Sequence, residues 1–171
     1  MNIFPIDLNS RKCAKWSCDQ HVVKIISEAV LIYSSALYYY DQKKWESIPK
    51  EEKYGPINLP LVRWATNKNN RRWLAYYIYH LNKEYEYRYE RKHKAYLVFK
   101  SLSEKYFEVP YLDIILDKPE QDFVQCMPEE FKGTDSVTAY RKYYQFKYRE
   151  GFKRPMRWTK REIPMFLKEV V

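Results

Sequence analysis

Residues 18–36 read CDQHVVKIISEAVLIYSSA, and this stretch decides the fold. At 100° per residue, most apolar side chains from Val22 onward fall within one broad arc, which is the face that a core helix buries. The arc consists of Val22, Ile26, Ala29, Val30, Tyr33, Ala36 and Leu37. We therefore expect a long central helix that has Asp19 as its N-cap and ends near Tyr40.

The opposite side of this helix carries a polar stripe. His21, Lys24, Glu28 and Ser35 lie there together with Ile25 and Ile32. Because isoleucines share this side, we expect a helix buried nearly all round, whose polar stripe faces a cleft rather than bulk water. Glu28 is then a candidate acid or base. An exposed face with ordinary i,i+4 and i,i+7 pairs fits the spacing equally well.

The rest of the sequence favours one all-α domain over residues 1–171, a length sufficient for one core. Three glycines and the lack of an alternating apolar pattern leave little room for β-hairpins. We expect about five helices in total, the first being the long catalytic helix. After an extended start that Pro5 keeps out of a helix, the others are expected over residues 61–72 (a short helix or turn), 69–92, 94–106 and 136–149. Loops are expected over 41–60 and in the acidic segment up to Pro128.

The charge of the chain points to a polyanionic partner. The net charge is +9 and the pI is about 9.3. Nine lysines and arginines lie between Arg141 and Arg161, with Glu150 as the single acid, and aromatic residues alternate with them, as in AYRKYYQFKYREGFKRPMRW. Cations offset phosphate charge and aromatic faces stack on exposed bases. This pattern favours nucleic-acid binding over a solvated basic helix face with its tyrosines half in the core.

Cysteine usage and hydropathy suggest an intracellular protein. Cys13, Cys18 and Cys126 do not form a disulfide framework. A zinc site made of Cys13, Cys18 and His21 lacks a second ligand pair, so we predict no metal and no cofactor. The apolar runs are broken before membrane-spanning length and the N-terminus lacks the pattern of a signal peptide. We expect a cytoplasmic monomer that does not bind a membrane.

Four stretches together resemble a known family: DQHVVKIISE, PLVRWATNKNNRRWLAYYIYHLNKEYEYRY, MPEEFKG and KRPMRW. In this order they are similar to the phage pyrimidine-dimer DNA glycosylases of the endonuclease V type. The resemblance spans most of the chain, although each motif is short. It implies a small, basic, all-α enzyme, active inside the host cell of a phage or virus. Such an enzyme cuts the glycosidic bond of a damaged or modified pyrimidine in double-stranded DNA, without a metal.

The resemblance also implies catalytic roles. In the family, a free N-terminal amine attacks the sugar C1′ to form a Schiff base, after which β-elimination breaks the strand. An α-amine suits this role because its ordinary pKa, about 8, leaves more neutral amine than a lysine at about 10.4. Here the amine belongs to Met1, or to Asn2 if Met1 is removed. Glu28 matches the essential glutamate of the family, and His21 matches a histidine that positions the glutamate or contacts the DNA backbone.

Two departures from the family are visible. The Asn2 side chain is larger than those after which an initiator methionine is normally removed, so we expect Met1 to be retained, which puts covalent catalysis by Asn2 in doubt. The arginines that flank the glutamate in the family are replaced by Ser27 and Ala29.

A glycosylase must flip a nucleotide or kink the duplex to reach C1′, and phosphate contacts offset this cost. We expect Lys24, Arg63, Arg71 and Arg72 to contact phosphates. The segment KRPMRWTKRE would dock on DNA through Arg154, Arg157, Trp158, Lys160 and Arg161. The structural alternatives are that Trp158 packs into the core and that Arg71 and Arg72 are merely solvated.

Two other functions stay open. One is a viral enzyme that modifies a flipped base on the same scaffold and leaves it in the DNA. The other is a protein that binds DNA or RNA without catalysis.

Overall fold

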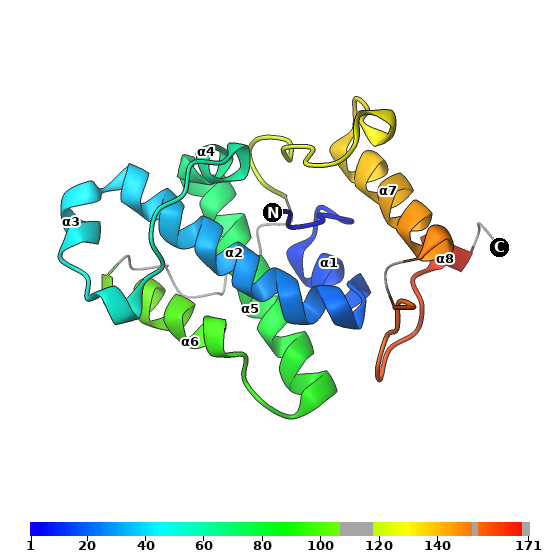
Figure 1. The fold of residues 1–171 in the computed structure, drawn as a ribbon, viewed down its shortest axis with the longest axis horizontal. Coiled ribbons are helices and arrows are strands. Elements are labelled where there is room, and N and C mark those ends of the chain that lie inside the picture. Colours follow the sequence, from blue (N-terminus) through cyan, green and yellow to red (C-terminus); the bar gives the residue numbers. More distant parts are fainter. Residues whose placement is uncertain (107–117, 152–153, 169–171) are drawn as a thin grey trace.

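The computed structural model describes residues 1–106, 118–151 and 154–168, and the regular secondary structure of this part is entirely helical (Figure 1). The predicted loop over 107–117 and the basic residue Lys153 lie outside the described residues. In chain order, the α-helices are α1 (Ser10–Trp16), α2 (Asp19–Tyr40), α3 (Gln42–Glu46), α4 (Pro60–Thr66), α5 (Lys68–Tyr89), α6 (Lys94–Ser101), α7 (Ser136–Glu150) and α8 (Met165–Lys168). Short 3₁₀ turns lie at Lys50–Glu52 (η1) and Glu129–Phe131 (η3), and a π-helical turn, η2, covers Leu102–Tyr106.

The long helix predicted from residues 18–36 is α2, and it occupies the centre of the molecule (Figure 1). All seven residues of the predicted core face are at most 2 % exposed. α2 crosses α5 and also packs against α4 and α6 (Figure 1). The predicted all-round burial is confirmed for much of the polar side, because Ile25, Ile32 and Ser35 are buried there as well.

The predicted N-cap of α2 is wrong by one residue. Cys18 takes the N-cap position without a side-chain hydrogen bond, and Asp19 is the first residue of the helix. The carboxylate of Asp19 instead binds tertiary partners: it accepts from the Thr159 backbone N–H at 3.0 Å and from Arg88 Nη1 at 3.0 Å. Asp19 therefore joins the start of α2 to α5 and to the C-terminal segment.

By length and composition, α2 is also the described helix that could cross a membrane. However, 61 % of its most apolar window is buried inside the fold. Such burial is what the central core helix of a soluble protein shows as well.

The other predicted helices are present with shifted ends. α5 begins at Lys68 because Asn67 caps it, its side chain accepting from the backbone N–H groups of Asn69 and Asn70 at 2.9 and 3.1 Å. Asn67 is extended, so it also ends α4. Three short helices, α1, α3 and α8, were not predicted. Each has at most seven residues, too few for a hydrophobic periodicity to show.

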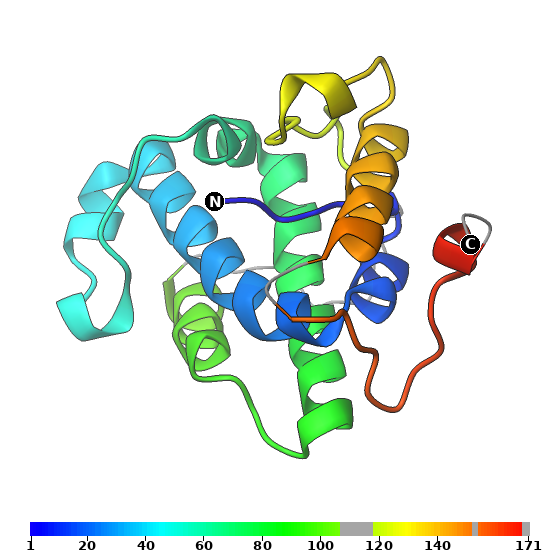
Figure 2. The same ribbon diagram turned by 45° about the vertical axis from the view of Figure 1, so that its right-hand side comes forward.

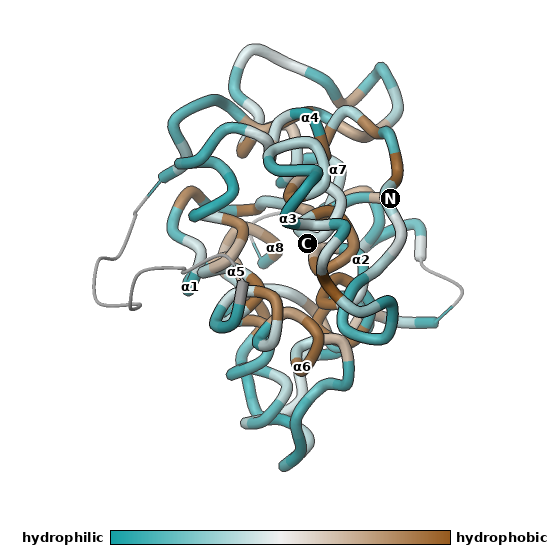
Figure 3. Tube along the Cα trace, turned by 90° about the vertical axis from the view of Figure 1, so that its left-hand side faces the viewer, coloured by the Kyte–Doolittle hydropathy of each residue, from teal (hydrophilic) through white to brown (hydrophobic). Residues whose placement is uncertain are grey.

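A single cluster of buried side chains runs from Ile3 to Leu167. Figure 3 shows hydrophobic residues along α2 and α6 in the middle of the molecule and hydrophilic residues on the outer loops. The N-terminal segment, residues 1–9, belongs to this core: it lies between α2 and α7 and passes over α5 (Figures 1 and 2). This placement brings the start of the chain to the side of α2 that carries Glu28.

Candidate active site

The N-terminal segment is held by contacts from two helices. Ile3 and Ile6 are completely buried. The Tyr77 hydroxyl of α5 donates to the Ile3 carbonyl at 3.1 Å, and Arg141 Nε of α7 donates to the Ile6 carbonyl at 2.8 Å. Arg141 also binds the Asp7 carboxylate at 2.9 Å. The beginning of the chain is therefore fixed in place rather than frayed.

Asn2 is the residue that faces Glu28. Its side-chain Nδ2 donates to the Cys126 carbonyl at 2.6 Å, and its Oδ1 accepts from the Phe4 backbone N–H at 2.9 Å. The tight turn puts Phe4 at φ 44°, in the left-handed region. With the side chain of Asn2 tied in this way, its backbone nitrogen donates to Glu28 Oε2 at 2.8 Å.

Glu28 keeps a connection to solvent. Its side chain is 19 % exposed, and its Oε1 lies 3.4 Å from Nζ of Lys24, which is itself 75 % exposed. Glu28 is thus a half-buried carboxylate that holds a nitrogen of the N-terminal segment on one side and a surface cation on the other. Two surface hollows lie elsewhere in the described part of the chain and are lined by other side chains, so the cleft expected beside Glu28 stays a prediction.

His21 lies in the interior. It is 4 % exposed, and its ring packs against Phe4, with centroids 4.3 Å apart, and against Tyr144 at 5.1 Å. Burial, followed by the charges of Lys147 and Lys24, lowers the pKa of His21 from 6.5 to about 3. A neutral, buried imidazole does not fit the predicted contact with a phosphate. Its contact with Phe4 instead helps to position the turn that carries Asn2.

Met1 reaches the surface next to this site. Its side chain is 47 % exposed. Burial raises the pKa of the Cys126 thiol, and the positive charge of the N-terminus partly offsets this. The N-terminal amine therefore lies near Cys126, and the nitrogen that Glu28 binds is the next one along the chain.

The C-terminal segment that was expected to dock on DNA packs against the fold instead, as the structural alternative for Trp158 predicted. Trp158 is 7 % exposed, and its Nε1 donates to the Trp16 carbonyl at 2.8 Å, so the indole does not offer a face to a base. The Arg157 carbonyl accepts from the backbone N–H of Asp19 at 2.8 Å. The segment thus covers the N-terminus of α2.

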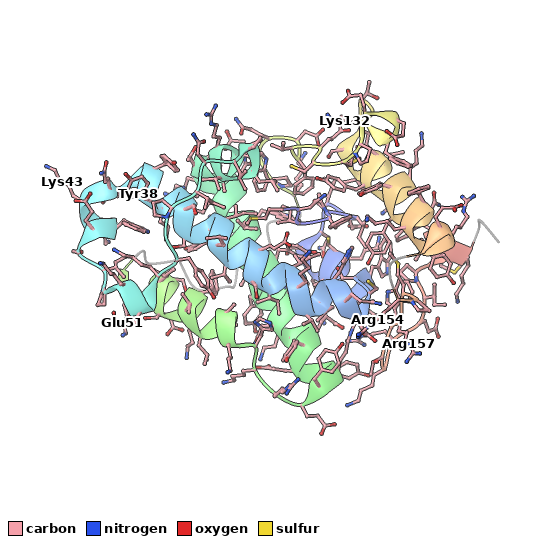
Figure 4. All side chains as sticks on the ribbon, viewed as in Figure 1. Tyr38, Lys43, Glu51, Lys132, Arg154 and Arg157 are labelled. Carbon is pink, nitrogen blue, oxygen red and sulfur yellow. The ribbon has the colours of Figure 1, made fainter. Side chains whose placement is uncertain are left out.

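The cations of this segment divide into two groups. Lys160 Nζ binds Glu90 at 2.9 Å, and Arg161 binds both oxygens of Glu84 at 2.8 and 3.0 Å. The side chains of Arg154 and Arg157 are instead exposed, beyond the start of α2 (Figure 4). Only these two of the five predicted docking residues present a charge without a salt bridge within the described part of the chain.

The arginines of α4 and α5 that were expected to contact phosphates also differ in their burial and in their partners. Arg71 is 7 % exposed, and its guanidinium donates to the carbonyls of Ala65 and Thr66 at 3.1 and 2.8 Å, which ends α4. Its predicted role in phosphate binding therefore does not fit. Arg72 is half-buried, whereas Arg63 is exposed and donates to Asn58 Oδ1 at 3.1 Å.

Part of the site was missed by sequence reasoning. Tyr140 is buried on α7, accepts from the Cys126 backbone N–H at 2.9 Å and donates to the Val124 carbonyl at 2.8 Å. It thereby fixes the Cys126 carbonyl that binds Asn2. The i,i+4 spacing of Tyr140 and Tyr144 was the available signal, but the aromatic run was interpreted as a surface for stacking on bases.

Within the described residues, no group of three or more His, Cys, Asp and Glu side chains could hold a metal ion. Comparison with known proteins gives no match, whether to a family model, a curated protein or a solved structure.

Proposed function

We propose that this protein is a DNA glycosylase that excises a damaged or modified pyrimidine from double-stranded DNA, with Glu28 as its essential carboxylate. One observation carries the proposal: Glu28 Oε2 lies 2.8 Å from the backbone nitrogen of Asn2, at the surface end of a fixed N-terminal segment. Once this nitrogen is a free amine, its pairing with a carboxylate is an arrangement suited to nucleophilic attack on C1′ and to the proton transfers that follow.

The identity of that nitrogen depends on Met1. While Met1 is present, the nitrogen of Asn2 is an amide whose lone pair is delocalised, so it does not attack carbon. Removal of Met1 turns the same atom into a primary amine beside the carboxylate. The amine route through Asn2 therefore requires removal of Met1, even though the size of Asn2 favours its retention.

The amine route proceeds in balanced steps. The neutral amine of Asn2 forms a bond to C1′, and the bond from C1′ to the base breaks, its electron pair leaving with the base. During this displacement the ionised Glu28 lies next to the positive charge that develops at C1′, and it then accepts the proton that the bonded amine loses. Glu28 returns this proton to O4′ as the C1′–O4′ bond breaks, which opens the sugar ring and gives the Schiff base. Loss of a C2′ proton expels the 3′ phosphate, which cuts the strand.

A chain that retains Met1 uses a different route. Glu28 then takes a proton from water, the water oxygen bonds to C1′, and the base leaves without a covalent adduct. Such a form excises the base but has no amine-dependent lyase activity. In both routes, Lys24 is placed to contact a phosphate next to the reacting sugar, since it is exposed and lies beside Glu28.

The test compares two forms of the chain, one beginning at Met1 and one cut to begin at Asn2, each with and without Glu28→Gln. Each form is incubated with duplexes that carry a pyrimidine dimer, an abasic site or a modified pyrimidine, and the strands are resolved with and without borohydride. We expect excision by both forms and a trapped adduct with the Asn2 form. Glu28→Gln should reduce turnover by about 10²-fold or more and leave binding intact. Glu51→Gln, an exposed glutamate in η1, is the matched control and should retain full activity.

Three results would contradict parts of the proposal. Excision by the Asn2 form without a trapped adduct overturns the amine route and supports water activation. A changed base that stays in the DNA, detected by mass spectrometry, identifies a base-modifying enzyme instead. Binding of every duplex without turnover, equal in Glu28→Gln, identifies a non-catalytic nucleic-acid-binding protein.

A further inference from the structure

A cationic hollow lies away from the residues of the candidate active site. It has a volume of about 640 Å³ and is formed by α1, the middle of α5 and the C-terminal segment. α2 contributes no residue to its lining. Its charged side chains are Arg11, Lys12, Lys15, Lys83, Arg161 and Glu84.

The one acid among these side chains is already neutralised. Glu84 binds Arg161 at 2.8 and 3.0 Å, and its Oε2 also lies 3.3 Å from Nη2 of the buried Arg88. With Glu84 occupied by two guanidinium groups, the remaining cations set the potential of the hollow.

Two of these cations are available for a ligand. Lys12 is paired with Asp7 and Lys83 with Glu86, both at 3.1 Å. Arg11 and Lys15 are exposed on α1 and form no salt bridge within the described part of the chain. They lie four residues apart, on one face of the helix.

His80, which also lines the hollow, is sensitive to this positive charge. Burial lowers its pKa from 6.5 to about 4, the nearby Arg11 contributes in the same direction, and Glu84 acts in the opposite direction. The imidazole is therefore neutral at pH 7, and its proton affinity reports the local charge. An anion bound beside Arg11 would offset part of this effect.

The cationic surface continues beyond the first hollow. A second hollow of about 330 Å³ shares Lys15 and Arg161 with the first and adds the half-buried Trp16, Lys160, which is paired with Glu90, and the acid Glu162, which lies 3.9 Å from Lys168. A single phosphate group would need one pocket. Two adjoining hollows with shared cations fit a chain of phosphates better, because phosphates repeat along a nucleic-acid strand.

We propose that these two adjoining hollows, between α1, α5 and the C-terminal segment, bind the phosphodiester backbone of a nucleic-acid strand as a second contact site, distinct from the Glu28 site. The inference rests on the proposed DNA substrate. Its test, however, uses undamaged DNA and requires no catalysis, so its failure and the failure of the proposed function are distinguishable.

The experiment measures the binding of an undamaged duplex by fluorescence anisotropy across a salt series. Arg11→Gln/Lys15→Gln should weaken binding about 10-fold at low salt and make the slope of log affinity against log salt shallower by about 1 to 2. The matched control is Lys43→Gln/Lys50→Gln, which removes the same charge from α3 and η1 at the other end of the molecule (Figures 1 and 4). The control should bind within about twofold of the original chain.

A second measurement locates the ligand. In an NMR titration, the pKa of His80 should rise when the duplex is added, and the rise should be absent in Arg11→Gln/Lys15→Gln. Equal duplex affinity in the two double variants overturns the proposal. A rise in the His80 pKa with inorganic tripolyphosphate but not with the duplex also overturns it, and identifies a small phosphate compound as the ligand. Thermal unfolding at the same temperature in both double variants shows that they are folded.

Discussion

At the scale of single residues, His21 shows how burial changes the role that the sequence predicts for a side chain. From its place on the polar stripe it was expected to position Glu28 or to contact the DNA backbone. In the fold its ring lies between Phe4 and Tyr144, where a charged imidazole would be poorly solvated. What remains is a positioning role: His21 supports Phe4, and Phe4 closes the turn that directs the nitrogen of Asn2 to Glu28.

The burial of His21 predicts a dependence of stability on pH. Its pKa falls from 6.5 in the unfolded chain to about 3 in the folded protein. Above pH 6.5 neither state binds this proton, so the full stability is present. As the pH falls below 6.5, the unfolded chain takes up the proton first, and stability is lost by at most about 1.4 kcal/mol per pH unit.

His21→Phe removes this proton while keeping a ring between Phe4 and Tyr144. We expect the free energy of unfolding of the original chain to fall more steeply than that of His21→Phe between pH 7 and pH 4, in denaturant titrations. The difference in slope is the measured quantity, so a constant offset from packing does not matter. Parallel curves for the two proteins would contradict the buried, neutral histidine.

At the scale of elements, α7 combines a clear sequence signal with an unexpected role. Its start is marked by Asp135, whose carboxylate accepts from the Thr138 backbone N–H at 2.7 Å. Hydrogen bonds from the side chain and then from the backbone N–H of Thr138 lower the pKa of Asp135. The helix then places Arg141 on the N-terminal segment and Tyr140 on the loop segment that contains Cys126. α7 was predicted as a DNA-binding helix, but its buried face supports the candidate active site.

The N-cap of α7 can be tested directly. Asp135→Ala should reduce the free energy of unfolding by about 1 kcal/mol at pH 7, because the first turn loses a partner for a backbone N–H. Asp135→Ser should recover most of this loss, since a hydroxyl also accepts that bond. Thr134→Ala, at the exposed neighbouring position, is the control. Urea titration measures all three variants, and an Asp135→Ala protein as stable as the control would disprove the cap.

At the scale of the whole molecule, the structure sorts the basic residues that the sequence presents as one patch. Arg161 pairs with Glu84 in α5, and Lys160 pairs with Glu90 directly after α5. Arg154 and Arg157 are instead exposed beyond the start of α2 (Figure 4). From Asp19 to Glu28, α2 rises by about 13 Å. If a duplex binds at Glu28 as proposed, we expect it to reach these two arginines within a few base pairs, since each base pair adds about 3.4 Å.

This arrangement predicts the salt dependence of binding to DNA with a damaged base. Arg154→Gln/Arg157→Gln should weaken binding and make the slope of log affinity against log salt shallower by about 1 to 2, whatever the sequence of the duplex. Anisotropy across a salt series measures both quantities. The double variant of Lys43 and Lys50 serves again as the charge-matched control. An unchanged slope would show that the two arginines do not contact phosphates of the bound DNA.

The sequence by itself determined the helical class and the long elements. The apolar arc of α2 indicated a core helix because hydrophobic periodicity is a local property of a chain, whereas the cap predicted for this helix was displaced by tertiary contacts of Asp19. The same reasoning identified Glu28 as a polar residue on a helix with little exposed surface.

Only the tertiary structure decided which polar side chains meet. The contact of Glu28 with Asn2 joins residues 26 positions apart, and that of Asn2 with Cys126 joins residues 124 apart. Three residues lie in polar stretches of sequence that predict exposed side chains: Arg71, Trp158 and Arg161. Each of them nevertheless binds a carbonyl or a carboxylate of another segment. Such pairings depend on how the helices pack, because a local pattern specifies which face a residue occupies but not what lies opposite to it.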